Sequence, residues 1–174
     1  MKITRIETIW IDEQPNTLWV QLHTDDGLVG LGETYYAPRA VSALIHDVFA
    51  SLLLGCSPLD IENHWANIFS TINFFGYAGA ETRALSAIDV ALWDIVGQHT
   101  GQPIYNLLGG RNRERVPVYN TCVSHGAIQD YHRWRYENRT GELAEELLQQ
   151  GIKAMKIWPF DQFGTSLGGP IGQR

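Results

Sequence analysis

The chain has 174 residues, and its 13 Lys and Arg against 19 Asp and Glu give a formal net charge of −6. This acidic balance argues against nucleic acid or an anionic membrane surface as the main partner. The two cysteines, Cys56 and Cys122, exclude a disulfide framework and a zinc site built from Cys-x-x-Cys pairs. Charges interrupt the N-terminal residues, and the longest apolar stretch, 48–54, is too short to span a membrane. We therefore expect a soluble, cytoplasmic protein.

Three strands are predicted before residue 37. Residues 2–11 are rich in β-branched side chains, which favour strands. Residues 18–24 alternate between apolar and polar side chains, as in a strand with one buried face. The Asp-Asp-Gly sequence at 25–27 favours a tight turn, because Asp and Gly tolerate the positive φ angles of hairpins. Residues 28–36 return as a third strand, so an antiparallel meander is expected.

Helices are predicted to follow the meander. Pro38 suits the first position of a helix whose apolar residues recur at steps of three and four, and Gly55 ends it. A second helix is expected to begin at Ser57 as N-cap, with Asp60 three residues on in the spacing of a capping box. The third helix, 82–98, carries only 3 charged residues and is predicted to be a buried central helix.

A second domain is predicted after the polar run 111–115, which follows a short helical turn at 103–108. Residues 116–122 and 152–158 are predicted strands, with a helix at 141–150 between them. That order is a βαβ unit, which implies that the two strands pair in parallel. The glycine-rich residues after 159 offer no closing helix or strand, so we expect the sequence to stop in the middle of a fold.

Several local motifs carry little chemistry. Gly30-Leu31-Gly32 lacks the third glycine of a dinucleotide-binding loop and lies in a predicted hairpin. Aromatic and basic residues alternate over 131–136, as in proteins that bind single-stranded nucleic acid, but one short segment on an acidic chain favours a surface loop or a loop beside an active site. The histidines do not show the spacing of a metal-binding pair. His125, just past the predicted strand 116–122, is either a solvated loop residue, which is the simpler interpretation, or a functional one.

Lys156 has the clearest functional placement of any single residue. In the predicted strand 152–158 it shares one face with Ile152, Ala154 and Trp158, and it lies near the C-terminal end of the strand. Its ammonium group either has a functional position or reaches solvent past apolar neighbours. Spacing alone leaves both interpretations open.

A longer pattern resembles a known family. Small side chains over 84–98, followed by Pro103 and Gly109, resemble the helix signature of the mandelate racemase/muconate lactonizing enzyme branch of the enolase superfamily. The resemblance implies an α+β capping domain at 1–111, with a three-stranded antiparallel sheet and helices. It further implies the start of a (β/α) TIM-type barrel at 112–174. About two of the eight barrel strands fit there, so the barrel is expected to be truncated.

The resemblance also implies a mechanism. In this family a carboxylate substrate binds Mg²⁺, and a base removes the proton α to the carboxylate to give an enediolate that the ion stabilises. The magnesium ligands are Asp and Glu residues at the ends of the third, fourth and fifth barrel strands. We therefore expect no metal ligand in this chain and place the Mg²⁺ ligands in a missing C-terminal portion.

Acid-sugar dehydration is the implied activity, which would make the complete enzyme a lyase. The alternatives are an isomerase, namely a racemase or epimerase of a 2-hydroxy acid, and a catalytically incomplete fragment that persists as an interaction module. The expected partners are a small-molecule carboxylate substrate and further copies of the chain in a homo-oligomer.

Candidate site residues follow from the same resemblance. The family's second barrel strand commonly ends Lys-x-Lys with the second lysine as base, whereas this chain has Trp158 at that position. Trp158 cannot lower the pKa of a lysine by charge repulsion, so the candidate catalytic residue Lys156 is expected to contact the substrate carboxylate rather than abstract a proton. The base would be a histidine absent from this chain. Asn120 and Trp158 are further candidates for substrate binding, as are Tyr36 and Tyr77 on capping-domain loops, although large aromatic residues near strand ends usually pack.

Overall fold

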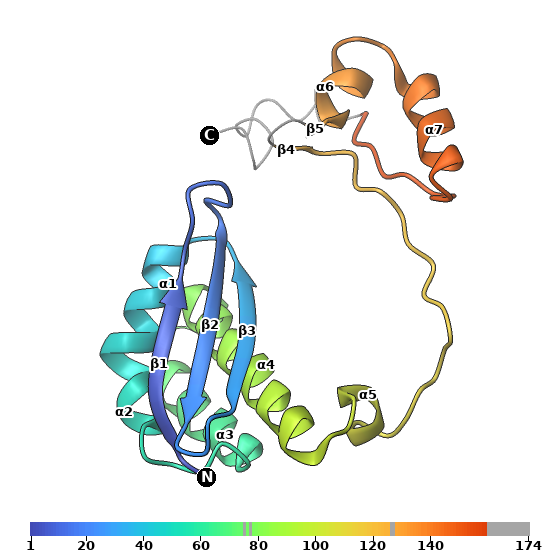
Figure 1. Ribbon diagram of the computed structural model, residues 1–174. Coiled ribbons are helices and arrows are strands. Elements are labelled where there is room, and N and C mark those ends of the chain that lie inside the picture. Colours follow the sequence, from blue (N-terminus) through green and yellow to red (C-terminus); the bar gives the residue numbers. More distant parts are fainter. Residues whose placement is uncertain (75, 77, 126–127, 160–174) are drawn as a thin grey trace. The chain divides into compact units, whose positions relative to one another are not determined.

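The computed structural model describes residues 1–74, 76, 78–125 and 128–159 (Figure 1). The chain divides into two compact units, Met1–Asn112 and Arg113–Arg174. The first unit contains β1 (Ile3–Ile9), β2 (Thr17–Thr24), β3 (Val29–Tyr35), α1 (Pro38–Leu44), the π-helix η1 (Ile45–Phe49), α2 (Ala50–Leu53), α3 (Ile61–Ile72), α4 (Ala80–Thr100) and α5 (Ile104–Leu107). The second unit contains β4 (Ser124–His125), β5 (Ile128–Gln129), α6 (Asp130–Arg135) and α7 (Thr140–Gln149).

The predicted antiparallel meander is confirmed. The strands pair in the order β1-β2-β3, and Gly27 at φ 88° closes the turn between β2 and β3. Leu18, Val20 and Leu22 of β2 are buried on one face, as their alternation predicted. The first strand is shorter than predicted and ends at Ile9, because the chain then turns into the loop that leads to β2.

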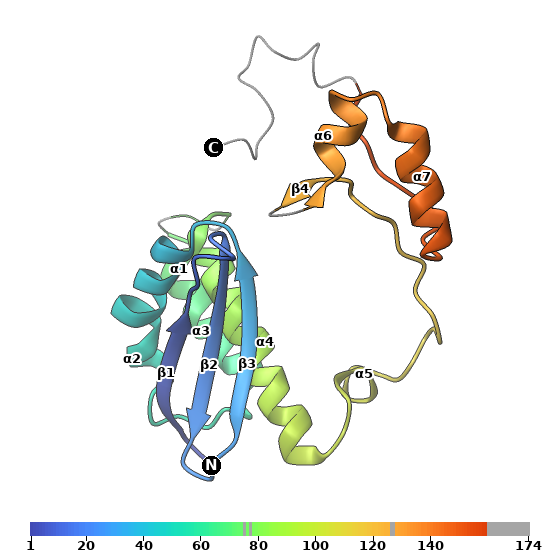
Figure 2. The same ribbon diagram turned by 45° about the horizontal axis from the view of Figure 1, so that its top comes forward.

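Helices cover one face of this sheet (Figures 1 and 2). The helix predicted from Pro38 to Gly55 forms as three consecutive segments, α1, η1 and α2, and Gly55 at φ 81° ends it. The predicted Ser57 cap is wrong, since α3 begins only at Ile61. The Ser57 hydroxyl accepts the Leu59 N–H at 3.3 Å instead, so its capacity is used in a local turn before the helix begins.

The central helix α4 is buried, as predicted, and lies against β3. A Cβ added at Gly32 would lie 1.9 Å from the carbonyl oxygen of Ala87, so only glycine allows this approach of the two backbones. The Leu31 N–H donates to Asp94 Oδ2 at 2.8 Å, and Gln98 Nε2 donates to the Val29 carbonyl at 2.7 Å. Side chains of α4 thus satisfy the backbone groups at the outer edge of β3, which would otherwise be open to pairing.

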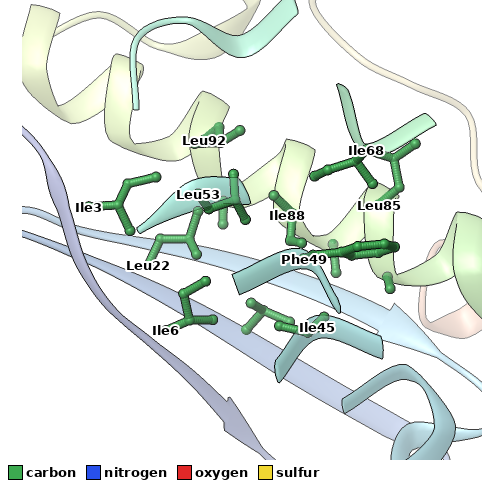
Figure 3. Packing of buried hydrophobic residues seen from close by; sticks show 14 of the residues in the cluster. Ile3, Ile6, Leu22, Ile45, Phe49, Leu53, Ile68, Leu85, Ile88 and Leu92 are labelled. Carbon is green, nitrogen blue, oxygen red and sulfur yellow. The ribbon is translucent and has the colours of Figure 1, made fainter. Parts of the chain in front are cut away.

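A single apolar cluster fills the space between the sheet and its helices (Figure 3). Its largest fully buried side chains include Phe49, Leu22, Leu53, Ile88 and Leu92. In the part of the chain that the structure describes, no helix combines the length and apolarity needed to cross a bilayer.

The second unit has its own small core of Cys122, Trp134, Leu143 and Leu147. The helix predicted at 141–150 is α7, and Gly151 at φ 82° follows its end. A helix that was not predicted, α6, forms in the aromatic and basic segment because Trp134 is drawn into this core and its indole N–H donates to the Cys122 carbonyl at 2.8 Å.

The two strands predicted in the second unit are corrected to a single bridge. Residues 116–122 and 152–158 pair in parallel, as predicted, but only between Asn120 and Met155. Val116 and Val118, which precede the bridge, are 71% and 65% exposed, so within the described part of the unit they are not packed into a longer strand pair. The predicted absence of an element after 159 concerns residues outside those described.

The approach of α4 to β3 predicts a large effect of one methyl group. Gly32→Ala is expected to destabilise the first unit by about 2–3 kcal/mol, because the clash is with backbone that cannot rotate away. Gly97→Ala is the matched control: its Cβ would meet the flexible end of Ile104 at 2.8 Å and backbone, the Gln102 carbonyl oxygen, only at 3.2 Å, and helix propensity offsets part of the cost. Denaturant unfolding of both variants checks this, and an equal loss of stability in the two would contradict it.

Candidate functional site

The bridge between the two chain segments of the second unit brings two of the predicted site residues together. The Lys156 N–H donates to the Asn120 carbonyl at 2.8 Å, and the Asn120 N–H donates to the Ala154 carbonyl at 3.0 Å. Asn120 and Lys156 are therefore held side by side by the backbone, although they are 36 positions apart in the sequence.

The Lys156 ammonium lies over two aromatic rings. Its Nζ is 5.4 Å from the ring centroid of Tyr119 and 5.0 Å from that of Trp158. Cation–π contact holds the charge in place while the side chain stays exposed, and among the described residues no acid forms an ion pair with the ammonium group. This arrangement can bind a carboxylate. Tyr119 was missed as a site residue, and parallel pairing of the segments at Asn120 was the signal that could have found it.

Trp158 connects this cation to the core of the second unit. Its ring centroid is 6.3 Å from that of Trp134, and it packs against the apolar cluster together with Ile152, Met155 and Ile157. The predicted sharing of one face by Ile152, Lys156 and Trp158 is thus only partly correct. Lys156 is exposed, whereas the other two turn toward the core because burying them removes a large apolar area from water.

The Asn120 side chain is engaged within its own unit. Its Oδ1 accepts the Cys122 N–H at 2.6 Å, and its Nδ2 donates to Asp130 Oδ2 at 3.4 Å. Burial raises the pKa of the Cys122 thiol, and the Asp130 carboxylate raises it further, while a backbone hydrogen bond from Lys156 acts in the opposite direction. The thiol is therefore a neutral packing group. The Asn120 side chain fixes the local backbone, including the Asn120 carbonyl that accepts the Lys156 N–H.

Tyr36 lies in the first unit, directly after β3. It has φ 85° and is followed by Ala37 at φ 53°, a left-handed pair that is unusual for residues with a Cβ. The Tyr36 N–H donates to the Asn16 carbonyl at 2.6 Å, and the Arg83 guanidinium lies 5.7 Å from the ring centroid. Two loops and α4 thus hold this ring in an exposed position. The other predicted loop residue, Tyr77, lies outside the described residues.

The described residues do not form a metal centre. Among them, no group of three His, Cys, Asp or Glu side chains is placed to hold an ion. His125 lies in the short strand β4, which pairs with β5. On α4, burial raises the pKa of Asp89, with a smaller contribution from the Glu62 carboxylate. This acid belongs to the packed helix layer, and among the described residues it and Glu62 are not joined by a third potential metal ligand.

Comparison with known proteins places these features in a family. A family profile described as mandelate racemase / muconate lactonizing enzyme, N-terminal domain, matches residues 8–109. The chain is 33% identical over 162 residues to a D-galactonate dehydratase of Variovorax paradoxus, with 90% of this chain and 38% of that protein covered. It is also 33% identical over 171 residues to a D-galactarolactone cycloisomerase of Agrobacterium fabrum, with 90% and 44% covered.

A solved structure agrees with the sequence comparisons. The crystal structure of an enolase of the mandelate racemase subgroup from Agrobacterium tumefaciens superposes with a TM-score of 0.80 at 41% identity, covering 95% of this chain and 41% of that one. The chain thus spans less than half the length of these relatives. The three-stranded sheet with its helices is the capping domain of that fold. The chain belongs to the mandelate racemase/muconate lactonizing enzyme branch of the enolase superfamily and corresponds to the N-terminal portion of its members.

Proposed function

We propose that this chain forms the capping domain, residues 1–111, and the start of the barrel, residues 112–174, of an enzyme that dehydrates an acid sugar. The observation that carries the proposal is the exposed Lys156 cation, held over Tyr119 and Trp158 beside Asn120. An exposed cation that is held over two rings suits the carboxylate that every acid sugar carries. The similarity to a D-galactonate dehydratase supports dehydration as the reaction.

The reaction makes defined demands on Lys156. Removal of the proton at C2 moves negative charge onto the substrate carboxylate, and a hydrogen bond from an ammonium group strengthens as that charge grows. Loss of the C3 hydroxyl as water and tautomerisation of the resulting enol then give a 2-keto-3-deoxy acid. In this proposal Lys156 binds and stabilises the carboxylate, and the proton is taken by a histidine that this chain does not supply.

Magnesium is assigned no ligand in this chain. The described residues contain no cluster that fits an octahedral ion with oxygen ligands. We propose that its ligands lie in the portion of the relatives that this chain does not cover. A cytoplasmic location and a homo-oligomeric assembly stay predictions from the sequence.

An isomerase is the second candidate function. The similarity to a D-galactarolactone cycloisomerase, at the same identity and coverage of this chain as the dehydratase, favours it. Both activities begin with loss of a proton α to a carbonyl group, so the same lysine could serve either. The fate of the intermediate distinguishes them, because only the dehydratase releases water.

The activity is tested on the complete product of the gene, whose intact mass is measured first. With Mg²⁺ and a panel of acid sugars that includes D-galactonate, we expect a 2-keto-3-deoxy acid, detected as its semicarbazone. Chelation of the ion is expected to abolish the reaction, and added Mg²⁺ to restore it. Proton exchange into an acid without release of a keto acid would instead support the isomerase. A complete product of 174 residues with neither activity would overturn both.

Lys156 is tested by Lys156→Ala in the same protein. We expect kcat/KM to fall by about 10- to 100-fold, the effect of losing one hydrogen bond to a charged group. Lys153→Ala is the matched control, because Lys153 is also exposed and lies three residues away in the same segment. A Lys156→Ala enzyme with unchanged kcat and KM would remove Lys156 from the site.

Tyr36 is tested by Tyr36→Phe, which keeps the ring and deletes the hydroxyl. If the phenol contacts the substrate, KM is expected to rise about fivefold, the loss of one neutral hydrogen bond. Tyr35→Phe serves as control, since Tyr35 is a neighbouring exposed tyrosine at the end of β3. Steady-state kinetics on the identified substrate give the answer, and an unchanged KM for Tyr36→Phe would remove Tyr36 from the site.

A further inference from the structure

Trp134 of α6 contacts both of the groups that hold Lys156. It lies in the segment 131–136, where aromatic and basic residues alternate, and it is 7% exposed in the core of the second unit. One contact is a hydrogen bond to the backbone near Asn120, and the other is a ring contact with Trp158. All of these residues belong to the second unit, so their relative positions are those within one compact body.

The backbone contact fixes a conformation that a residue with a Cβ rarely adopts. Cys122 has φ 51°, in the left-handed region. Its N–H donates to Asn120 Oδ1 at 2.6 Å, and its carbonyl accepts the Trp134 indole N–H at 2.8 Å in a buried hydrogen bond. Such conformations persist where surrounding contacts impose them, and these two hydrogen bonds fix the peptide groups on both sides of Cys122.

The conformation at Cys122 places two donors on one carbonyl. The Asn120 carbonyl accepts the Lys156 N–H at 2.8 Å, and it also accepts the Cys122 thiol at 3.5 Å. The thiol keeps its proton because burial raises its pKa. The conformation at Cys122, and with it the Trp134 hydrogen bond, therefore sets the position of the carbonyl that binds the Lys156 backbone.

The ring contact supports the ammonium end of the same side chain. The Lys156 Nζ lies 5.0 Å from the ring centroid of Trp158, and this centroid lies 6.3 Å from that of Trp134, with the two rings tilted by 43°. Trp158 is partly buried against the apolar cluster that includes Trp134. Trp134 thus backs the ring over which the charge lies, while its indole N–H fixes the backbone at the other end of Lys156.

The position of Trp134 is set by the pair of helices α6 and α7. Its ring shares a core with Leu143 and Leu147 of α7. The Arg133 guanidinium joins the two helices by donating to both carboxylate oxygens of Glu146, at 2.8 and 2.6 Å. Packing and this ion pair therefore hold the indole in place from the side away from Lys156.

The indole N–H is a feature that filling the core does not require. Phenylalanine or leucine would fill apolar space without adding a buried donor that has to be satisfied. Trp134 satisfies its donor on the Cys122 carbonyl, two residues from Asn120, and not within its own helix.

We propose that Trp134 is a positioning residue for Lys156. It holds the backbone at the bridge through the Cys122 carbonyl and the cation through the Trp158 ring, so that the ammonium group meets the substrate carboxylate in one orientation. The role rests on the proposed function in one respect, namely that Lys156 binds a carboxylate. It extends that function to α6, which holds the lysine from the core and does not touch the substrate.

The first test measures the position of the ammonium group in the complete product of the gene. Lysines are dimethylated with isotope-labelled formaldehyde, which keeps their charge, and the Lys156 NMR signal is assigned by its loss in Lys156→Arg. Because Lys156 lies over two rings and Lys153 is exposed, we expect the Lys156 signal upfield of the Lys153 signal. In Trp134→Phe, which keeps a ring and removes the N–H, the Lys156 signal is expected to lose most of this displacement.

The second test is a kinetic double-mutant cycle on the acid sugar that the protein dehydrates. Trp134→Phe is expected to lower kcat/KM about fivefold, the effect of losing one neutral hydrogen bond. In the Lys156→Ala background the same substitution is expected to lower it no further, because no cation is left to position. Leu143→Met is the matched control, since Leu143 lies in the same core and the change conserves volume; it is expected to leave the Lys156 signal and kcat/KM unchanged.

The outcomes separate this role from the proposed function. The positioning role is overturned if the Lys156 signal stays in place in Trp134→Phe, if the kinetic loss is equally large without Lys156, or if Leu143→Met reproduces it. A displaced signal in a protein without activity on any acid sugar supports the positioning role and overturns the proposed function alone. If circular dichroism shows that Trp134→Phe has lost its fold, benzothienylalanine at position 134, which has the shape of tryptophan without the N–H, replaces it with the same expectations.

Discussion

The close contact between α4 and β3 is the constraint on which the first unit depends. Two glycines of β3, Gly30 and Gly32, let the carbonyls of α4 approach where a Cβ would lie within 2.1 Å and 1.9 Å of them. Asp94 and Gln98 of the same helix then bind the outer edge of the strand. The helix thereby packs the core and protects the sheet edge at once, and neither role tolerates a shift of the helix along the strand. The residues 84–98 that resemble the family signature include those of α4 that form this contact.

Elements whose structure is decided by a local physical rule could be predicted from the sequence. Gly55 was predicted to end a helix, and it has a positive φ angle just after α2; Gly101 and Gly151 follow α4 and α7 with the same conformation. The reasoning failed where two local rules compete or where a distant partner decides. Ser57 is a residue type that caps helices, but its hydroxyl accepts the Leu59 N–H in the turn before α3. The helix α6 could not be predicted because Trp134 packs into a core whose other residues are distant in the sequence.

The candidate site shows the same division. Lys156 and Asn120 were selected from the resemblance, and the parallel bridge brings them together, but their relation to Tyr119 required knowledge of the register between two distant segments. The left-handed conformation of Tyr36 was equally inaccessible, because tyrosine has no preference for it and surrounding contacts, such as that with Asn16, impose it. Contacts between residues distant in the sequence therefore determine the two features that could not be predicted, the position of Tyr119 beside Lys156 and the conformation of Tyr36.

Stability and chemistry occupy different parts of this chain. The α4–β3 contact uses glycines, alanines and two polar side chains, Asp94 and Gln98, whose hydrogen bonds go to strand backbone. The exposed cation Lys156 instead lies next to the parallel bridge between Asn120 and Met155, where the regular pairing of the described residues is limited to one pair. Irregular segments can present such groups because fewer of their neighbours are fixed by packing. The resemblance to the family consequently identifies the fold through residues that perform no chemistry, and specificity has to be sought at the irregular positions.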